Sequence, residues 1–294
     1  MVGSLDAQQG ATLNVSMPGQ NGNLTGSLAQ TDLLTQNGSN PFQTLISTTE
    51  GITGFENLQL SGGNSGSGLL QDIVSGNTTV ATGHYDYELA SGNGGKDVGI
   101  SYTLTQVDIE DNRTLTLTGT ADGSTLSAAL TGSTSGELIV DGTKGSKVSL
   151  TGTNTYSGST TVNAGVTLEA GVSGLGHTEN LLVSGTYVNS GANTIGGLTV
   201  DQNGELDLGA AGTVLTIAET DEAESSVING TLTGSGTLHL ANDGVGLTIN
   251  SSNAAFGGTL IIGSGANTGI TTITQASALG SGTVVFGSSG SKYS

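Results

Sequence analysis

The densest group of side chains with acid-base chemistry lies at His84, Tyr85, Asp86 and Tyr87. An imidazole can act as a general base, a carboxylate can orient it, and the chain is rich in serine hydroxyls. However, neighbouring residues of a strand point to opposite faces, and no strand-turn-helix pattern of the kind that presents a catalytic serine surrounds them. The sequence therefore predicts no catalytic residues, and we interpret this segment as a strand with one buried tyrosine.

A second group of interest is an acidic cluster of four carboxylates, Glu219, Asp221, Glu222 and Glu224. Calcium prefers many oxygen ligands, so the cluster has the composition of a calcium site. It also interrupts the apolar rhythm of the chain, which indicates a solvated loop. We expect a loop that holds no metal and that can serve as a contact surface, because loops on a rigid scaffold often carry recognition.

The remaining candidate ligands are isolated. His177 and His239 have no nearby partner residues in sequence, so we interpret them as ordinary polar side chains and expect no metal or other cofactor. The segment Gly94–Asp97 shares two glycines with the nonapeptide of calcium-binding β-rolls, but it occurs once and contains a lysine where the pattern has none. A plain turn is the simpler interpretation.

The charge balance excludes two classes of partner. The 294 residues contain 24 acidic and 5 basic side chains, for a net charge of -19. Such a surface repels phosphate backbones and anionic lipid headgroups, so we expect no nucleic-acid binding and no binding to membrane surfaces. The five basic residues are Lys96, Arg113, Lys144, Lys147 and Lys292.

The chain has no cysteine and no stretch approaching 18 apolar residues. It therefore has no disulfide framework and no predicted membrane-spanning helix, and the absence of disulfides suits a protein that crosses a periplasm unfolded. Residues 1–4 show neither the basic nor the apolar region of a signal peptide. We expect a segment that is not itself inserted in a membrane and from which any signal has been removed.

Short runs of alternating apolar residues dominate the pattern, for example at Thr114–Thr118, Glu205–Leu208 and Val214–Ile217. A period of two predicts strands, and the Gly, Asn, Ser and Asp residues between the runs predict turns. With 51 glycines and 3% aromatic residues, the chain has little bulk for a spherical core. Many short strands that share a thin aliphatic core are the better expectation.

Internal repeats indicate how such strands assemble. The segment Leu130–Leu138 recurs as Leu232–Leu238, and Asn154–Gly158 has a looser counterpart in Asn253–Gly258, at an offset of about one hundred residues. One turn of a solenoid cannot bury its own apolar residues, but stacked turns join them into a continuous core. We therefore predict an all-β chain folded as a right-handed parallel β-helix (β-solenoid), with about a dozen turns of roughly 20 to 25 residues.

One segment carries a family resemblance. The run Leu150–Leu168 resembles the passenger-associated repeat of type V autotransporters, whose pattern is close to L-x-G-x-N-x-Y-x-G-x-T-x-V-x-x-G-x-L. It keeps the Asn, the Tyr, both glycines, the Thr and the Val of that pattern, and Ala276–Val284 is similar to the portion that usually follows the repeat. The resemblance covers residues 146–294, whereas residues 1–145 are similar to passengers mainly in composition.

The resemblance implies a passenger domain of an AIDA-I or antigen 43-like autotransporter adhesin. In such a protein residues 1–145 would be the N-terminal part of the β-helix and residues 146–294 its continuation with the passenger-associated repeats. The implied location is the surface of a Gram-negative bacterium, with an outer-membrane barrel anchor outside this chain. The implied partners are another copy of the protein on a neighbouring cell, or a host or matrix protein or glycan, in self-association, biofilm formation or attachment.

Two other functions remain open from the sequence. A passive β-helical stalk would present or help to fold another domain without binding anything itself. A polysaccharide-processing β-helix would need a groove of acidic and basic residues, for which Lys144 and Lys147 beside carboxylates would be the signal. No segment has the pattern of a globular protease or esterase, so we expect a protein that is not an enzyme.

Overall fold

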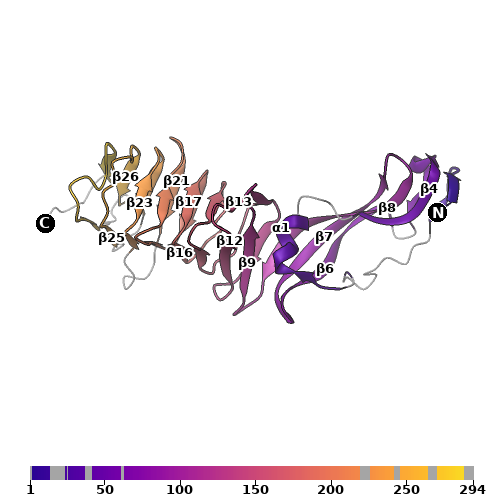
Figure 1. The fold of residues 1–294 in the computed structure, drawn as a ribbon, viewed down its shortest axis with the longest axis horizontal. Coiled ribbons are helices and arrows are strands. Elements are labelled where there is room, and N and C mark those ends of the chain that lie inside the picture. Colours follow the sequence, from indigo (N-terminus) through magenta and orange to yellow (C-terminus); the bar gives the residue numbers. More distant parts are fainter. Residues whose placement is uncertain are drawn as a thin grey trace. The chain divides into compact units, whose positions relative to one another are not determined.

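The computed structural model describes residues 2–13, 24, 26–36, 42–60, 63–218, 226–241, 246–263 and 270–287. Strands make up 57% of it and helices 4%, which confirms the all-β prediction. The chain divides into two compact units, Met1–Asp108 and Ile109–Ser294 (Figure 1). None of the helices found in the described ranges has the length and hydropathy that a bilayer-spanning helix requires.

Unit Ile109–Ser294 is a parallel β-helix, because strands from successive turns pair in parallel to form three sheets, as Figure 1 shows. The eight-stranded sheet contains, in order, β9 (Thr114–Gly119), β12 (Glu137–Gly142), β14 (Thr160–Val162), β16 (Asn180–Val183), β19 (Gly197–Val200), β22 (Ser226–Ile228), β25 (Gly246–Ile249) and β27 (Ile270–Ile273). The six-stranded sheet contains β10 (Ser124–Leu126), β13 (Lys147–Leu150), β15 (Thr167–Ala170), β17 (Thr186–Asn189), β20 (Glu205–Asp207) and β23 (Thr231–Thr233). The five-stranded sheet contains β18 (Ala192–Ile195), β21 (Val214–Ile217), β24 (Thr237–Leu240), β26 (Thr259–Ile262) and β28 (Thr283–Phe286), and β11 (Ala129–Gly132) is a further strand of this unit.

Strand register measures the length of each turn. Leu138 pairs with Thr160 and Thr160 with Leu181, so these turns contain 22 (160 − 138) and 21 (181 − 160) residues. The turn between Thr199 and Val227 contains 28 (227 − 199) residues, because the acidic cluster lies within it. The unit has about seven turns. The turns of 22 and 21 residues have the expected length, whereas the turn of 28 residues exceeds it. The expected dozen turns is wrong, because residues 1–108 form a separate unit.

The core of the β-helix is a set of apolar rows that run from turn to turn. In each strand alternate side chains point inward, and stacking aligns them with their equivalents about 4.8 Å away. One row of the eight-stranded sheet is fully buried along its length and consists of Leu117, Val140, Val162, Val183, Val200, Ile228 and Ile249. Aliphatic residues that each bury little area therefore form one continuous core.

Three residues of the segment that resembles the passenger-associated repeat lie at contacts between adjacent turns or in the core: Asn154, Tyr156 and Gly158. Asn154 is buried; its Oδ1 accepts a hydrogen bond from the Leu130 N–H (2.7 Å), and its Nδ2 donates one to the Gly174 carbonyl (2.6 Å). Tyr156 is fully buried. A Cβ at Gly158 would lie 1.6 Å from the Gly136 carbonyl oxygen, so only glycine fits. The asparagine joins three turns, and the glycine lets two of them approach.

The second copy of this motif makes the same contacts. Asn253 Oδ1 accepts from the Leu232 N–H (2.8 Å), and its Nδ2 donates to the Ala278 carbonyl (2.8 Å). Phe256 is buried, and a Cβ at Gly258 would lie 2.1 Å from the Gly236 carbonyl oxygen. Tyr156 and Phe256 thus hold equivalent buried positions in the two copies.

The two copies nevertheless lie on different sheets. The strand that follows the first motif is β14, in the eight-stranded sheet, whereas the strand that follows the second is β26, in the five-stranded sheet. The offset of about one hundred residues is therefore not a whole number of turns. The motif contacts only the adjacent turns, so it can join turns next to the eight-stranded sheet or next to the five-stranded sheet.

Unit Met1–Asp108 has a different architecture, a mixed sheet in the order β1-β4-β8-β7-β6-β3. Its strands are β1 (Val2–Asp6), β3 (Leu28–Ala29), β4 (Phe42–Thr53), β6 (Ser65–Ser75), β7 (Thr78–Gly92) and β8 (Asp97–Ile109), and β2 (Thr12–Leu13) pairs with β5 (Gln59–Leu60). Short helical segments are η1 (Gln30–Asp32), α1 (Leu33–Gln36) and η2 (Phe55–Asn57). The pairs β4 with β8 and β6 with β7 are antiparallel.

This unit differs from the expected N-terminal part of a β-helix in the length of its strands. β4, β6, β7 and β8 contain 12, 11, 15 and 13 residues, whereas the strands of the β-helix contain six or fewer. Strands of this length do not fit a β-helical turn, which needs a corner every few residues, and β6 and β7 pair as an antiparallel hairpin. Residues on either side of position 145, by contrast, belong to one β-helix, because β12 and β14 pair directly.

Candidate functional site

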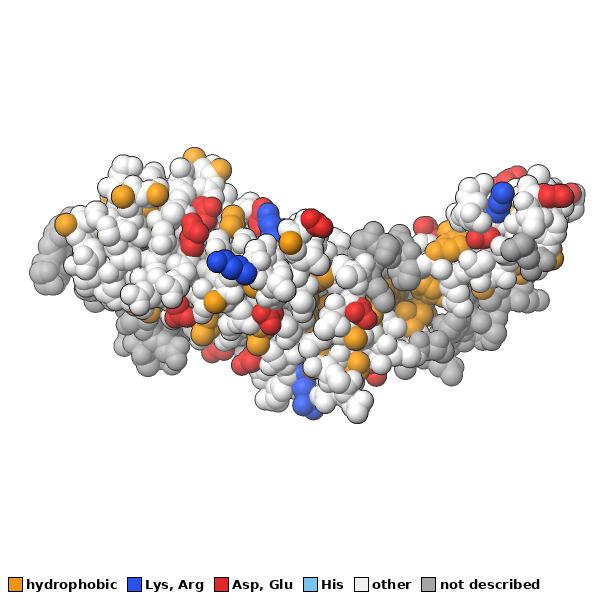
Figure 2. Space-filling model, viewed as in Figure 1, with side chains coloured by type: hydrophobic (Ala, Val, Ile, Leu, Met, Phe, Trp, Pro, Cys, Tyr) orange, Lys and Arg blue, Asp and Glu red, His pale blue; other side chains and the backbone are white. Residues whose placement is uncertain are grey.

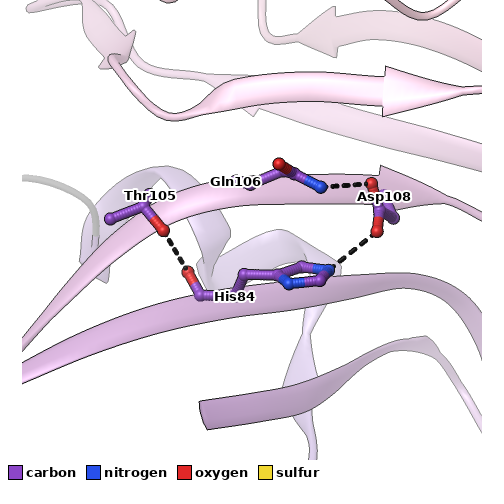
Figure 3. A network of polar contacts seen from close by, with 4 residues as sticks. All are labelled: His84, Thr105, Gln106 and Asp108. Carbon is purple, nitrogen blue, oxygen red and sulfur yellow. Dashed lines mark hydrogen bonds and ion pairs between the residues drawn. The ribbon is translucent and has the colours of Figure 1, made fainter. Parts of the chain in front are cut away.

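The His84 segment forms a polar pair with a carboxylate from the neighbouring strand (Figure 3). His84 Nε2 lies 2.7 Å from Asp108 Oδ2, and Gln106 Nε2 donates to Asp108 Oδ1 at 2.8 Å. The Thr105 hydroxyl donates to the His84 main-chain carbonyl at 3.2 Å. The His84 and Asp108 side chains are 31% and 39% exposed, so the pair lies at the surface.

The carboxylate beside His84 is Asp108, whereas Asp86 is exposed on the same strand as the histidine. Sequence adjacency suggested Asp86, but the hairpin of β7 and β8 decides the pairing. The signal for this hairpin is Asn93–Lys96, a turn with left-handed backbone at Asn93, Gly94 and Gly95, as the plain-turn interpretation requires.

The pair has two parts of a catalytic arrangement, a base and a group that orients it. In the described part of the chain, His84 makes hydrogen bonds with Asp108 and Thr105, and neither supplies a nucleophile to the imidazole. The contacts of His84 with Asp108 and Thr105 link β7 to β8. Both carboxylate oxygens of Asp108 are engaged, Oδ2 by His84 and Oδ1 by Gln106. The geometry therefore serves to tie the hairpin together.

The tyrosines of the same strand lie in the core. Tyr85 is 3% exposed, and burial raises the pKa of its hydroxyl to about 12. It packs with Leu60, Leu69 and Ile100, while Tyr87 is partly buried at the edge of this cluster. The predicted buried tyrosine is confirmed.

A charged cluster lies on the outward face of the six-stranded sheet. The Glu169 carboxylate is 2.5 Å from Lys147 Nζ and accepts hydrogen bonds from the hydroxyls of Ser190 (2.8 Å) and Ser149 (3.4 Å). The hydrogen bonds from Lys147 and Ser190 lower the pKa of Glu169 below its usual value. Lys147 thus lies beside a carboxylate, that of Glu169. Lys144 is exposed and lies near Gly165.

The lowered pKa of Glu169 makes a prediction about acid stability. The pKa of this carboxyl is lower in the folded chain than in the unfolded chain, where it is near 4.5. The ionised carboxylate therefore stabilises the fold above pH 4.5. That stabilisation is lost as the pH falls through the folded pKa. We expect Glu169→Gln to lower the urea midpoint at pH 6 by a small amount, because the group is partly exposed, and to lower it less at pH 2.5, which is below the unfolded pKa. Glu205→Gln on the same sheet is the control; an equal loss at both pH values would contradict the assignment.

Neither isolated histidine approaches a metal site. His177 is exposed in a turn, and His239 lies half-buried on the outward face of β24. No group of three or more potential metal ligands occurs within the described ranges. The acidic cluster Glu219, Asp221, Glu222 and Glu224 lies outside the described residues.

The largest regular surface is the outward side of the eight-stranded sheet. Its middle row consists of Thr116, Ile139, Thr161, Leu182, Thr199, Val227, Thr248 and Thr272, aligned by the strand register. All eight are half-buried or exposed, none is charged, and Leu182 is 39% exposed. We call this outward side the neutral face, after its uncharged middle row.

Two polar rows flank the middle row of the neutral face. The leading row contains Thr114, Glu137, Ser159, Asn180, Gly197 and Gly246, and the trailing row contains Thr118, Asp141, Asn163, Ser184, Asp201, Asn229, Asn250 and Thr274. Side chains bond along the trailing row: Ser184 to Asp201, Asn250 Nδ2 to Asn229 Oδ1 (2.8 Å), and Thr274 Oγ1 to Asn250 Oδ1 (3.1 Å). Figure 2 shows the β-helical unit as a largely neutral surface with charged side chains in a few separate places.

Comparison with known proteins adds one relative. No model of a protein family matches the chain, and no solved structure matches it. The chain is 34% identical over 225 residues to the uncharacterized protein YuaQ of Escherichia coli (strain K12), an alignment that covers 71% of this chain. The chain spans 16% of the length of that protein. The similarity therefore identifies a much longer relative and carries no activity with it.

Proposed function

We propose that this chain is part of the passenger of a cell-surface adhesin of the autotransporter type, displayed outside a Gram-negative cell. The observation that carries the proposal is the Asn-aromatic-Gly motif, which resembles the passenger-associated repeat and is used twice for the same contacts between turns. Asn154 and Asn253 each join three turns, and Gly158 and Gly258 each admit a close backbone approach. A parallel β-helix with this motif is the framework that such a passenger requires.

The surface of the β-helix suits adhesion through many weak contacts. Outward residues of its strands are mainly Thr, Ser and Asn beside a few aliphatic side chains, repeated at each turn. Each such group contributes little alone, but repetition along the sheet and across many copies on a cell produces firm attachment. The partner is another copy on a neighbouring cell, or a host or matrix protein or glycan.

Aggregation of cells that display this chain tests the proposal. We expect these cells to settle, cells with the display scaffold alone to stay dispersed, and the purified chain to block settling by competition. Because two surfaces of net negative charge repel, homotypic settling should increase with salt, whereas attachment to a basic host ligand should decrease.

A passive stalk is the second candidate, and the regular stack of about seven turns favours it. A stalk of this kind holds another domain away from the cell without contacts of its own. Cells that neither settle nor bind matrix proteins or glycans at any salt concentration would support the stalk and overturn the adhesin.

A further inference from the structure

We propose that Asn93, in the turn between β7 and β8, is a site of spontaneous deamidation. Asn93 and Gly94 are both exposed and have left-handed backbone, with φ of 50° and 64°. In an Asn-Gly pair the main-chain nitrogen of the glycine can attack the side-chain amide of the asparagine, because glycine has no side chain to obstruct the approach. The reaction needs no partner, so it is independent of the proposed adhesion.

The reaction replaces an amide by a carboxylate. The Gly94 nitrogen loses its proton and forms a bond to Cγ of Asn93, and the side-chain nitrogen leaves as ammonia. Water then opens the cyclic succinimide. Attack of water at one ring carbonyl gives aspartate, and attack at the other gives isoaspartate, in which the main chain runs through the side-chain carbon. Water is the one co-reactant, and both products add a negative charge to the turn.

The nucleophile at this turn is free to move. The turn is closed by the N–H groups of Gly95 and Lys96, which both donate to the Gly92 carbonyl, at 3.0 and 3.1 Å. Among the described residues, neither the Gly94 N–H nor the Asn93 side chain makes a hydrogen bond, and a Cβ at Gly94 would meet nothing within 4 Å. Rotation of the Gly94 nitrogen toward the Asn93 side chain therefore breaks no bond of that nitrogen.

A second Asn-Gly pair, Asn203–Gly204, is held in the β-helix. The Gly204 N–H donates to the Asp201 carbonyl at 2.9 Å, and a Cβ at Gly204 would lie 2.2 Å from the Val183 carbonyl oxygen. The glycine is thus packed against the previous turn. Its nitrogen can reach the Asn203 side chain only after this contact opens, which makes the reaction slower.

A third pair, Asn229–Gly230, is held through both of its residues. Asn229 Oδ1 accepts a hydrogen bond from Asn250 Nδ2 at 2.8 Å, and a Cβ at Gly230 would lie 2.2 Å from the carbonyl oxygens of Asp201 and Gly204. Ring closure here must break the side-chain hydrogen bond and move the glycine away from the neighbouring turn. Of the three pairs in the described ranges, the one at Asn93 is therefore the most reactive.

The turn that would be modified also holds β4. The Gly95 carbonyl accepts a hydrogen bond from the Ile52 N–H (3.0 Å), and the Lys96 carbonyl accepts from the Thr48 N–H (2.8 Å) and hydroxyl (2.9 Å). An isoaspartate at position 93 lengthens the main chain shortly before these two carbonyls. They can then no longer keep their positions opposite β4, so the modification loosens this strand of unit Met1–Asp108.

Peptide mass spectrometry of the purified chain, aged in mildly alkaline buffer, tests the site. We expect deamidation at Asn93 to be faster than at Asn203 or Asn229 by at least about tenfold, because only the latter two require an opening of the β-helix. In concentrated urea the three pairs should react at similar rates, since the difference comes from the fold. Equal rates in the folded chain, or an Asn93 that stays intact while the unfolded chain reacts, would overturn the proposal.

Hydrogen exchange tests the consequence for β4. In the aged chain the amides of Thr48 and Ile52 should exchange faster than in the fresh chain. Asn93→Gly is the matched control, because glycine accepts the left-handed backbone and has no amide to lose. Its exchange at Thr48 and Ile52 should not change with ageing. If the variant loses the same protection as the unaltered chain, modification of Asn93 does not loosen β4.

Discussion

Gly258→Ala is expected to lower the free energy of unfolding of the β-helix by about 3 to 5 kcal/mol. The added methyl would lie 2.1 Å from the Gly236 carbonyl oxygen, and this neighbour is backbone of the previous turn. Neither atom can move aside without separating two turns, and separation breaks the parallel hydrogen bonds on both sides of the motif. Thermal unfolding followed by circular dichroism measures the effect.

The neighbouring glycine supplies the control. At Gly257 an added Cβ meets only the Ser281 hydroxyl, at 3.5 Å, and the residue is exposed. Gly257→Ala is therefore expected to change stability by less than about 1 kcal/mol, in either direction. Equal unfolding temperatures for the two variants would show that the turns are not in the close contact described, and the shared role of Gly158 and Gly258 would then be wrong.

Asn154→Ala is expected to lower the free energy of unfolding by about 3 kcal/mol. The change removes both hydrogen bonds of the side chain and leaves the Leu130 N–H and the Gly174 carbonyl without a partner in the dry interior. Buried main-chain groups of this kind cost free energy because water cannot reach them. Urea unfolding of the purified chain measures the loss.

Two further variants test the mechanism at Asn154. Asn154→Asp keeps the acceptor toward Leu130 but loses the donor toward Gly174 and adds a buried charge, so it should be at least as destabilising at neutral pH. Asn163→Ala, at a half-buried position in the same repeat, should be much milder. If Asn154→Ala unfolds like Asn163→Ala, the asparagine does not join the turns.

Local features of the sequence determined much of the β-helix. The alternation of apolar residues over runs such as Val214–Ile217 identified strands, because side chains of a strand alternate between core and solvent over a few residues. The motif that contains Tyr156 and Phe256 is repeated in the sequence, and both rings are buried in the β-helical core. Both features are patterns of residues that lie close together in the chain, so they can be recognised in one sequence without the structure.

Pairing between distant residues was decided only by the tertiary structure. The partner of His84 is Asp108 and not Asp86, because a hairpin register brings them together. The same alternation that predicts a strand does not say whether its neighbour is parallel or antiparallel, so unit Met1–Asp108 forms a mixed sheet where a β-helix was expected.

The neutral face likewise depends on register. Leu182 and Thr199 are adjacent in space because β16 pairs with β19 after a turn of 17 (199 − 182) residues, whereas the following turn has 28 (227 − 199). Turns of unequal length hide the alternation of threonine and aliphatic residues in the linear sequence. The sequence by itself determined which residues form strands and which side chains are apolar, because these properties are local. The tertiary structure alone decided which of them share a row, because stacking joins residues through hydrogen bonds between turns and not through their spacing along the chain.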